Sequence, residues 1–286
     1  MKPTTFGVAP SGQAGHIFGM RTIAMLVAGL MTLWSVPASA SSTQWYQTEG
    51  ANIRLITSGL PDASGKLSGV LQIDLRPGWK TYWRDPGDAG VPPSLDVSRS
   101  VNVTSAELHF PAPERFEDAS GHWAGYKHPV DLPVTFVVKV PGDPAVIEAD
   151  VFLGVCETVC IPVQLSISVD PAAQPDDADD VATVEAALAA LPGPEQPDFG
   201  VTPLPSGDPD TILVEAAFPG EPEGVEFFLA ASDGFAFGAP ERTEVDGKLR
   251  FKVPVLDRPG EKPTQGSLRY TLAARVSAVD GFIPFP

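Results

Sequence analysis

The sequence predicts a mainly β protein in which one β-sandwich is followed by a second, smaller β domain. The 31 prolines and 27 glycines among 286 residues disfavour long helices and favour short strands joined by turns. Short β-branched or alternating apolar runs recur along the chain, which is typical of half-buried strands. Turn-forming pairs such as Pro77-Gly78 and Pro141-Gly142 separate these runs.

The first sandwich is expected over residues 41–170. At least six apolar runs fall in this range. They have the length of sandwich strands and are separated by turn residues. The clearest runs are residues 53–56, 70–75, 103–110, 134–140, 147–155 and 161–169.

Residues 171–198 are predicted to be a linker that contains a short amphipathic helix. The segment opens with acidic residues, which favour the first turn of a helix. Four apolar residues then recur at helical spacing until Pro192 ends the pattern: Val181, Val184, Leu188 and Leu191.

The second, smaller β domain is expected over residues 199–286. Its predicted strands are residues 212–218, 225–229, 249–255 and 268–276.

Residues 1–40 have the pattern of a secretory signal peptide. They contain no acidic residue, Arg21 precedes the apolar stretch 22–34, and small residues end the segment at Ala40. An N-terminal membrane anchor is the alternative, although the apolar stretch is short for a membrane span. We expect cleavage after Ala40 and export to an oxidising compartment, where a cysteine pair can persist as a disulfide.

The charge balance argues against a role in nucleic-acid binding. The chain has 19 basic and 36 acidic residues, a formal charge of −17. Removing the predicted leader takes away Lys2 and Arg21 and moves this charge to −19. Such a surface repels nucleic acids and anionic lipid headgroups.

The chain has two cysteines, Cys156 and Cys160, between two of the predicted strands. If these strands pair as a hairpin, Glu157-Thr158-Val159 is the connection and the cysteines face each other at disulfide distance. Three interpretations stay open: a redox-active pair, a structural staple and a metal site. A disulfide that closes so short a loop restrains the unfolded chain little. As a structural staple it would therefore stabilise the fold by only about 2 kcal/mol. Two thiolates alone make a poor closed metal site.

Four blocks in order resemble the N-terminal periplasmic domain of the DsbD thiol:disulfide interchange family, and its ScsB-type variant in particular. The match covers about residues 45–170. The blocks are residues 78–88 (GWKTYWRDPGD), 110–116 (FPAPERF), 125–134 with GYK and LPV, and 154–162 (GVCETVCIP).

This resemblance implies an immunoglobulin-like sandwich whose cysteine pair, Cys156 and Cys160, carries electrons. Such domains accept two electrons from a membrane-embedded reductase through a thioredoxin-like domain and reduce oxidised periplasmic proteins. By the same analogy Cys160 forms the mixed disulfide, and no organic cofactor or metal is needed. The resemblance also implies the residues that line the active site: Trp79, Tyr82, Glu117, Asp118 and Tyr126.

The chain departs from the best-known members of that family in three ways. Only three residues separate the cysteines, as in the ScsB-type variant. Ala119-Ser120-Gly121 stands where a shielding aromatic is expected, so Phe116, His122 or Trp123 would have to shield the pair. Neither a membrane electron-transfer domain nor a thioredoxin-like domain follows in this sequence, so we expect it to depend on partners.

Two other functions are compatible with these residues. One is a binding or scaffold module in which the bridge is a staple. The other is a copper-handling role, because ScsB-type systems are associated with copper tolerance. The lack of Met-rich or His-rich runs argues against direct copper binding.

Overall fold

The computed structural model describes residues 41–87, 90–118, 121–231, 234–260 and 266–286, and these residues are mainly β. The predicted leader and residues 119–120 lie outside the described residues. All described residues fall within one compact unit. Among them, no helix has the length and apolar character needed to cross a membrane.

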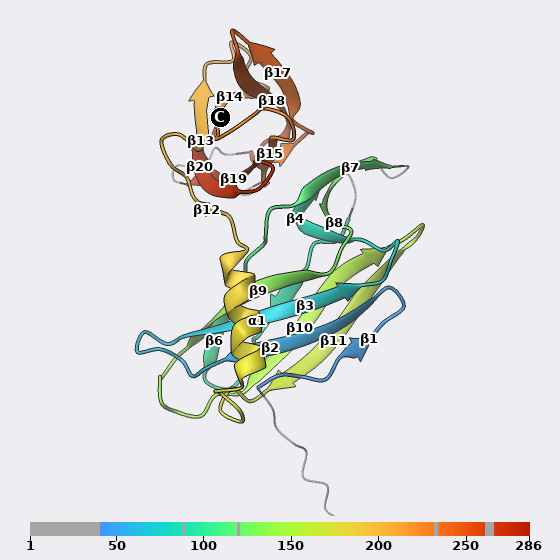
Figure 1. The fold of residues 1–286 in the computed structure, drawn as a ribbon, viewed down its shortest axis with the longest axis vertical. Helices are drawn as coiled ribbons and strands as arrows, with labels where there is room; N and C mark the ends of the chain where they lie inside the picture. The colour runs from blue at the N-terminus through green and yellow to red at the C-terminus, as the bar shows by residue number, and fades with distance from the viewer. Residues whose placement is uncertain (1–40, 88–89, 119–120, 232–233, 261–265) are drawn as a thin grey trace, which may run out of the picture. The chain divides into compact units, whose positions relative to one another are not determined.

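Two sheets enclose the core of the first part of the chain (Figure 1). One sheet has the order β1-β2-β3-β9-β6, and the other has the order β11-β10-β5. Side chains that alternate along β2 and β10, including Ile53, Leu55, Val151 and Leu153, are fully buried between the sheets. The strands are β1 (Tyr46–Gln47), β2 (Ala51–Ser58), β3 (Lys66–Leu75), β5 (Ser94–Asp96), β6 (Val103–Leu108), β9 (Val130–Val138), β10 (Ile147–Cys156) and β11 (Cys160–Val169).

A third, smaller sheet has the order β4-β8-β7. Its strands are β4 (Thr81–Gly87), β7 (Glu114–Asp118) and β8 (Gly121–Tyr126). We call it the covering sheet. Gly125 lets β8 approach β4 closely, because a Cβ there would lie 2.2 Å from the carbonyl oxygen of Thr81. The sequence did not predict this sheet as a separate unit, since its strands carry few of the apolar alternations typical of a strand.

The predicted helix is present as α1 (Ala178–Ala189). Asp177 caps its N-terminus by accepting from the backbone N–H groups of Asp179 and Asp180. The helix packs against the outer face of the first sheet, where Val184 and Ala187 are buried against Ile56 and Val70 (Figure 1). Leu188, which the spacing placed on the apolar face, is 38% exposed.

The remaining strands form two further sheets around a second core. One has the order β12-β20-β19-β15; the other has the order β13-β14-β18-β16, with β17 paired to β18. The strands are β12 (Gly193–Pro194), β13 (Gly200–Leu204), β14 (Thr211–Ala217), β15 (Glu226–Leu229), β16 (Ala236–Phe237), β17 (Glu241–Val245), β18 (Lys248–Asp257), β19 (Ser267–Ala273) and β20 (Ala278–Pro284). The predicted fold class, a β-sandwich followed by further β structure, is confirmed.

Candidate functional site

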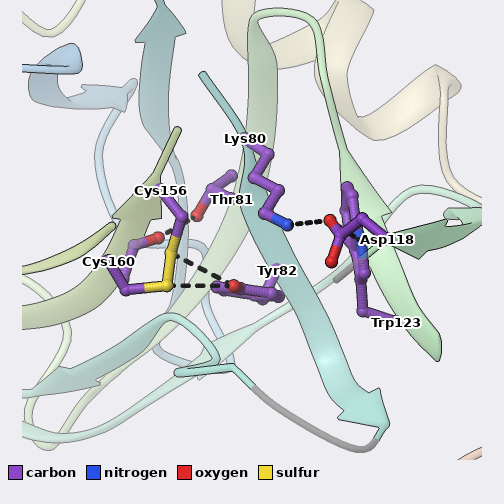
Figure 2. The surroundings of a disulfide bond; sticks show 8 residues. Lys80, Thr81, Tyr82, Asp118, Trp123, Cys156 and Cys160 are labelled. Carbon is purple, nitrogen blue, oxygen red and sulfur yellow. Dashed lines mark hydrogen bonds and ion pairs between the residues drawn. A yellow bond between two sulfur atoms is a disulfide. The ribbon is translucent and has the colours of Figure 1, made fainter. Parts of the chain in front are cut away.

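The two cysteines form a disulfide at the end of a β-hairpin (Figure 2). Cys156 is the last residue of β10 and Cys160 is the first of β11, and the two are directly paired. Their Cα atoms lie 4.0 Å apart. The predicted hairpin, with residues 157–159 as its connection, is therefore present.

The two halves of the bridge differ in their exposure. Cys156 is 1% exposed, and its backbone exchanges two hydrogen bonds with the backbone of Lys80, at 2.8 and 2.9 Å. Cys160 begins β11, the edge strand of its sheet, and is exposed. The neighbouring Val159 is 71% exposed. A molecule that approaches from solvent therefore meets Cys160 first.

The hydroxyl of Tyr82 contacts both sulfur atoms (Figure 2). It lies 3.1 Å from Sγ of Cys156 and 3.3 Å from Sγ of Cys160. Burial, and next the charge of Asp118, raise the pKa of Tyr82, so its hydroxyl stays protonated at neutral pH. A protonated hydroxyl can donate a hydrogen bond to a thiolate formed when the bridge opens.

The ring of Tyr82 is held in place by its neighbours. Gly90 lies directly against it, since a Cβ at this position would be 2.6 Å from the ring. The hydroxyl of Thr81, the preceding residue on β4, donates to the carbonyl of Gly154 on β10 at 2.9 Å. The position of the phenol relative to the bridge is therefore fixed by packing and by a buried hydrogen bond.

Trp123 of the covering sheet shields the buried half of the bridge. It forms a buried cluster with Tyr82 and Cys156, and its ring meets that of Tyr82 edge-on at 5.8 Å. Phe116 stacks on Trp123 with a centroid distance of 4.3 Å. Of the three residues suggested for this role, Phe116 and Trp123 lie here, whereas His122 lines a small cavity together with Trp83 and Arg115.

Asp118 holds Trp123 in this position (Figure 2). Its carboxylate accepts from the indole Nε1 of Trp123 at 2.8 Å and forms an ion pair with Lys80. The Lys80 side chain is 8% exposed, and its Nζ lies 4.2 Å from the centroid of the Trp123 ring. The predicted acidic residue is thus part of a partly buried network that connects Lys80, just before β4, with the β7–β8 hairpin.

The structure places the other predicted site residues as follows. Trp79 is half-buried and lies over Gly50, where a Cβ would be 2.0 Å from the indole. Glu117 is exposed and lies opposite His122 in the strand register of β7 and β8. Tyr126 is buried in the sandwich core, where its hydroxyl donates to the carbonyl of Pro111 at 2.9 Å and burial raises its pKa. Their roles in the active site stay predictions.

Sequence reasoning missed Lys80, Thr81 and Gly90 as parts of the site. Lys80 and Thr81 stand inside the aromatic block, but a polar residue on a strand does not reveal which face its side chain takes. The one available signal was the alternation of the strand, which puts Lys80 and Tyr82 on the same face.

This chain is similar to known proteins in sequence and in fold. Residues 58–170 match the family model described as thiol:disulfide interchange protein DsbD, N-terminal. This segment is therefore similar to the DsbD N-terminal domain. No curated protein matches the chain.

A solved structure extends the likeness beyond the segment that matches the family model. The crystal structure of the N-terminal periplasmic domain of ScsB from Proteus mirabilis superimposes with a TM-score of 0.69 at 24% sequence identity. The match covers 87% of this chain and 100% of that one, so it continues past residue 170 into the second set of sheets. At this identity the likeness establishes the fold. The Cys156–Cys160 bridge lies within residues 58–170, which match the DsbD N-terminal model, and the match and the bridge together support a thiol:disulfide exchange module.

Proposed function

We propose that this protein is a periplasmic electron carrier that exchanges its Cys156–Cys160 disulfide with partner proteins. It accepts electrons from a membrane-embedded reductase or a thioredoxin-like partner and reduces oxidised periplasmic proteins. One observation carries the proposal: an exposed sulfur at Cys160 is bonded to a buried sulfur at Cys156, and the Tyr82 hydroxyl contacts both. A disulfide with only a structural role needs neither an exposed sulfur nor a phenol beside the two sulfurs.

Reduction of the bridge begins at Cys160. A partner thiolate attacks its Sγ, a mixed disulfide forms, and the bond to Cys156 breaks. The electron pair of that bond leaves on the Cys156 sulfur. The second thiolate of the partner then attacks the partner sulfur that is bonded to Cys160. This attack forms the partner's disulfide and releases the Cys160 thiolate. The partner ends as a disulfide, and this protein ends with two electrons and, after protonation, two thiols.

Transfer to a client runs the same steps in reverse. The Cys160 thiolate attacks one sulfur of the client disulfide, and the electron pair leaves on the other client sulfur. Cys156 then attacks Cys160 in the mixed disulfide, which restores the bridge and frees the second client thiol. Because Cys156 is already next to Cys160 on the paired strand, this resolving step needs no movement of the backbone.

Tyr82 makes Cys156 a good leaving group. Thiol–disulfide exchange is faster when the departing sulfur is stabilised as a thiolate. A hydrogen bond to a charged group contributes about 1.5–3 kcal/mol, more than a bond to a neutral disulfide sulfur. The phenol therefore stabilises the reduced form more than the oxidised form.

The periplasmic location rests on two supports. The predicted leader indicates export, and the ScsB structure that shares this fold is described as a periplasmic domain. An oxidising compartment supplies the oxidised clients that such a carrier would reduce.

Electron transfer to a thioredoxin-like protein tests the proposal. The full-length mature chain is reduced, freed of reductant and mixed with an oxidised thioredoxin-like protein, and the thiols of both are counted by mass spectrometry after acid quenching. We expect both thiols of the chain to be lost as both partner thiols appear. The double variant C156S/C160S is the control for non-specific reduction. Transfer no faster than that from free cysteine at equal thiol concentration would favour the scaffold function.

A further inference from the structure

The covering sheet has two faces that carry different residues. Tyr82, Phe116 and Trp123 face the disulfide, where they form the cluster that buries Cys156. The next residues along β4 and β8, Trp83 and Ala124, belong to the main core cluster on the opposite face. This alternation follows from the two-residue repeat of a strand. A segment that packs on the opposite face of the covering sheet therefore also supports the residues that cover the disulfide.

Strand β15 of the second set of sheets packs on that opposite face. Phe228 lies against Trp83 with a centroid distance of 5.7 Å, and it is buried in the same core cluster. Arg115 of β7 donates to the carbonyl of Phe227 at 2.9 Å, and its guanidinium lies 4.7 Å from the centroid of Phe228. Arg115 thus connects the outermost strand of the covering sheet to β15.

Two further contacts tie β4 to the same region. Arg84 forms an ion pair with Asp280 of β20 at 3.2 Å, and their side chains are 13% and 15% exposed. Burial lowers the pKa of Arg84, and the Asp280 carboxylate opposes this effect. The carboxylate of Asp85 accepts from the backbone N–H of Ala231 at 2.7 Å. Both edge strands of the covering sheet, β4 and β7, are therefore anchored.

We infer that the second set of sheets is a brace that holds the covering sheet closed over Cys156, with Arg115 and Phe228 as positioning residues. A two-stranded hairpin such as β7–β8 has little stability of its own. Each anchoring contact lowers the population of states in which the hairpin lifts from the bridge. The consequence for electron transfer rests on the proposed function: the brace keeps Cys156 out of reach while Cys160 stays accessible.

The substitution Arg115→Ala tests the brace in the full-length chain. In the oxidised protein we expect amide hydrogen exchange of the β7–β8 hairpin to be about tenfold faster, the effect of losing one hydrogen bond from a charged group. In the reduced protein, iodoacetamide should modify Cys156 about tenfold faster, through the same opening. Modification of Cys160 should not change. Phe228→Ala, which removes the ring under Trp83 and Arg115, should act in the same direction.

Arg250→Ala is the matched control. Arg250 and Arg115 are 24% and 25% exposed, and both pair with a glutamate, but Arg250 contacts Glu215 within the second set of sheets. Arg250→Ala should leave the hydrogen exchange of the β7–β8 hairpin and the modification rate of Cys156 unchanged. Arg115→Lys should restore part of the protection that Arg115→Ala removes. Unchanged hairpin exchange in both Arg115→Ala and Phe228→Ala would overturn the brace. Faster hydrogen exchange of the hairpin with an unchanged rate of Cys156 modification would overturn the role of the brace in covering this cysteine.

The failure of the proposed function is a separate outcome. If the wild-type bridge resisted reduction in the folded protein, electron transfer would be refuted. Hydrogen exchange in the oxidised protein would still decide whether the brace exists.

Discussion

Replacing Cys156 with serine should leave a thiol at Cys160 that captures disulfides rapidly, whereas Cys160→Ser should leave a thiol that hardly reacts. The remaining cysteine is exposed in the first variant and 1% exposed in the second. A buried thiol reacts only when the structure around it opens. If this opening costs about 2.7 kcal/mol, the two rates differ by about 100-fold.

The measurement is the rate of mixed-disulfide formation with a thioredoxin-like protein that lacks its resolving cysteine, followed by mass spectrometry. Labelling in denaturant, where both thiols are accessible, gives the control for equal thiol content. Equal rates in the folded variants, or faster capture by the Cys160→Ser protein, would contradict the assignment of Cys160 as the attacked sulfur.

Tyr82→Phe should make the bridge harder to reduce. The phenol stabilises the Cys156 thiolate in the reduced form, and the substitution removes this hydrogen bond while the ring stays in place. The loss of about 1.4 kcal/mol or more corresponds to a midpoint potential at least about 30 mV more negative. Reduction by dithiothreitol should slow by about tenfold, because the leaving sulfur is no longer stabilised.

Tyr126→Phe provides the matched control for this prediction. Tyr126 is also one of the predicted site residues, and its substitution also removes one hydrogen bond of a phenol. That bond is part-buried and goes to the carbonyl of Pro111, away from the sulfurs. We expect this variant to lose stability by about 1–3 kcal/mol and to keep the wild-type potential. An equal potential shift in both variants would show that the effect comes from the fold and not from the phenol at the sulfurs.

The cysteine hairpin was predictable from the sequence because its geometry is local. Two apolar runs flank Cys156 and Cys160, and a connection of three residues leaves them directly opposite each other. The strands of the main sandwich were predictable for the same reason, since alternation and turn residues are properties of neighbouring positions. The resemblance carried by the aromatic block added Tyr82, which contacts both sulfurs.

The cover of the bridge was not predictable in this way because it depends on contacts between distant segments. Trp123 reaches Cys156 from another sheet, and the carboxylate that holds it is paired with Lys80, 38 positions away in the chain. The packing of helix α1 is a second example. Helical spacing identified its apolar residues, but only the tertiary structure buries Val184 and leaves Leu188 more exposed.

The anchoring of the covering sheet is a third example of the same limit. The sequence suggested a separate second domain over residues 199–286, and the domain boundaries remain a prediction. Nothing in the local pattern of Arg84 or Arg115 indicates that each reaches a residue of that segment. Arginine residues on strands are more often solvated, so their partners emerge only from the folded chain.

A glutathione-buffered redox titration, with circular dichroism recorded on the same samples, tests the electron-transfer account most directly. A short loop restrains the unfolded chain little, so reduction should leave the sandwich folded. We predict a midpoint potential above about −300 mV, where exchange-active disulfides lie, with unchanged circular dichroism across the transition. A bridge that stays oxidised until the protein unfolds would contradict the account and leave Cys156–Cys160 as a structural staple.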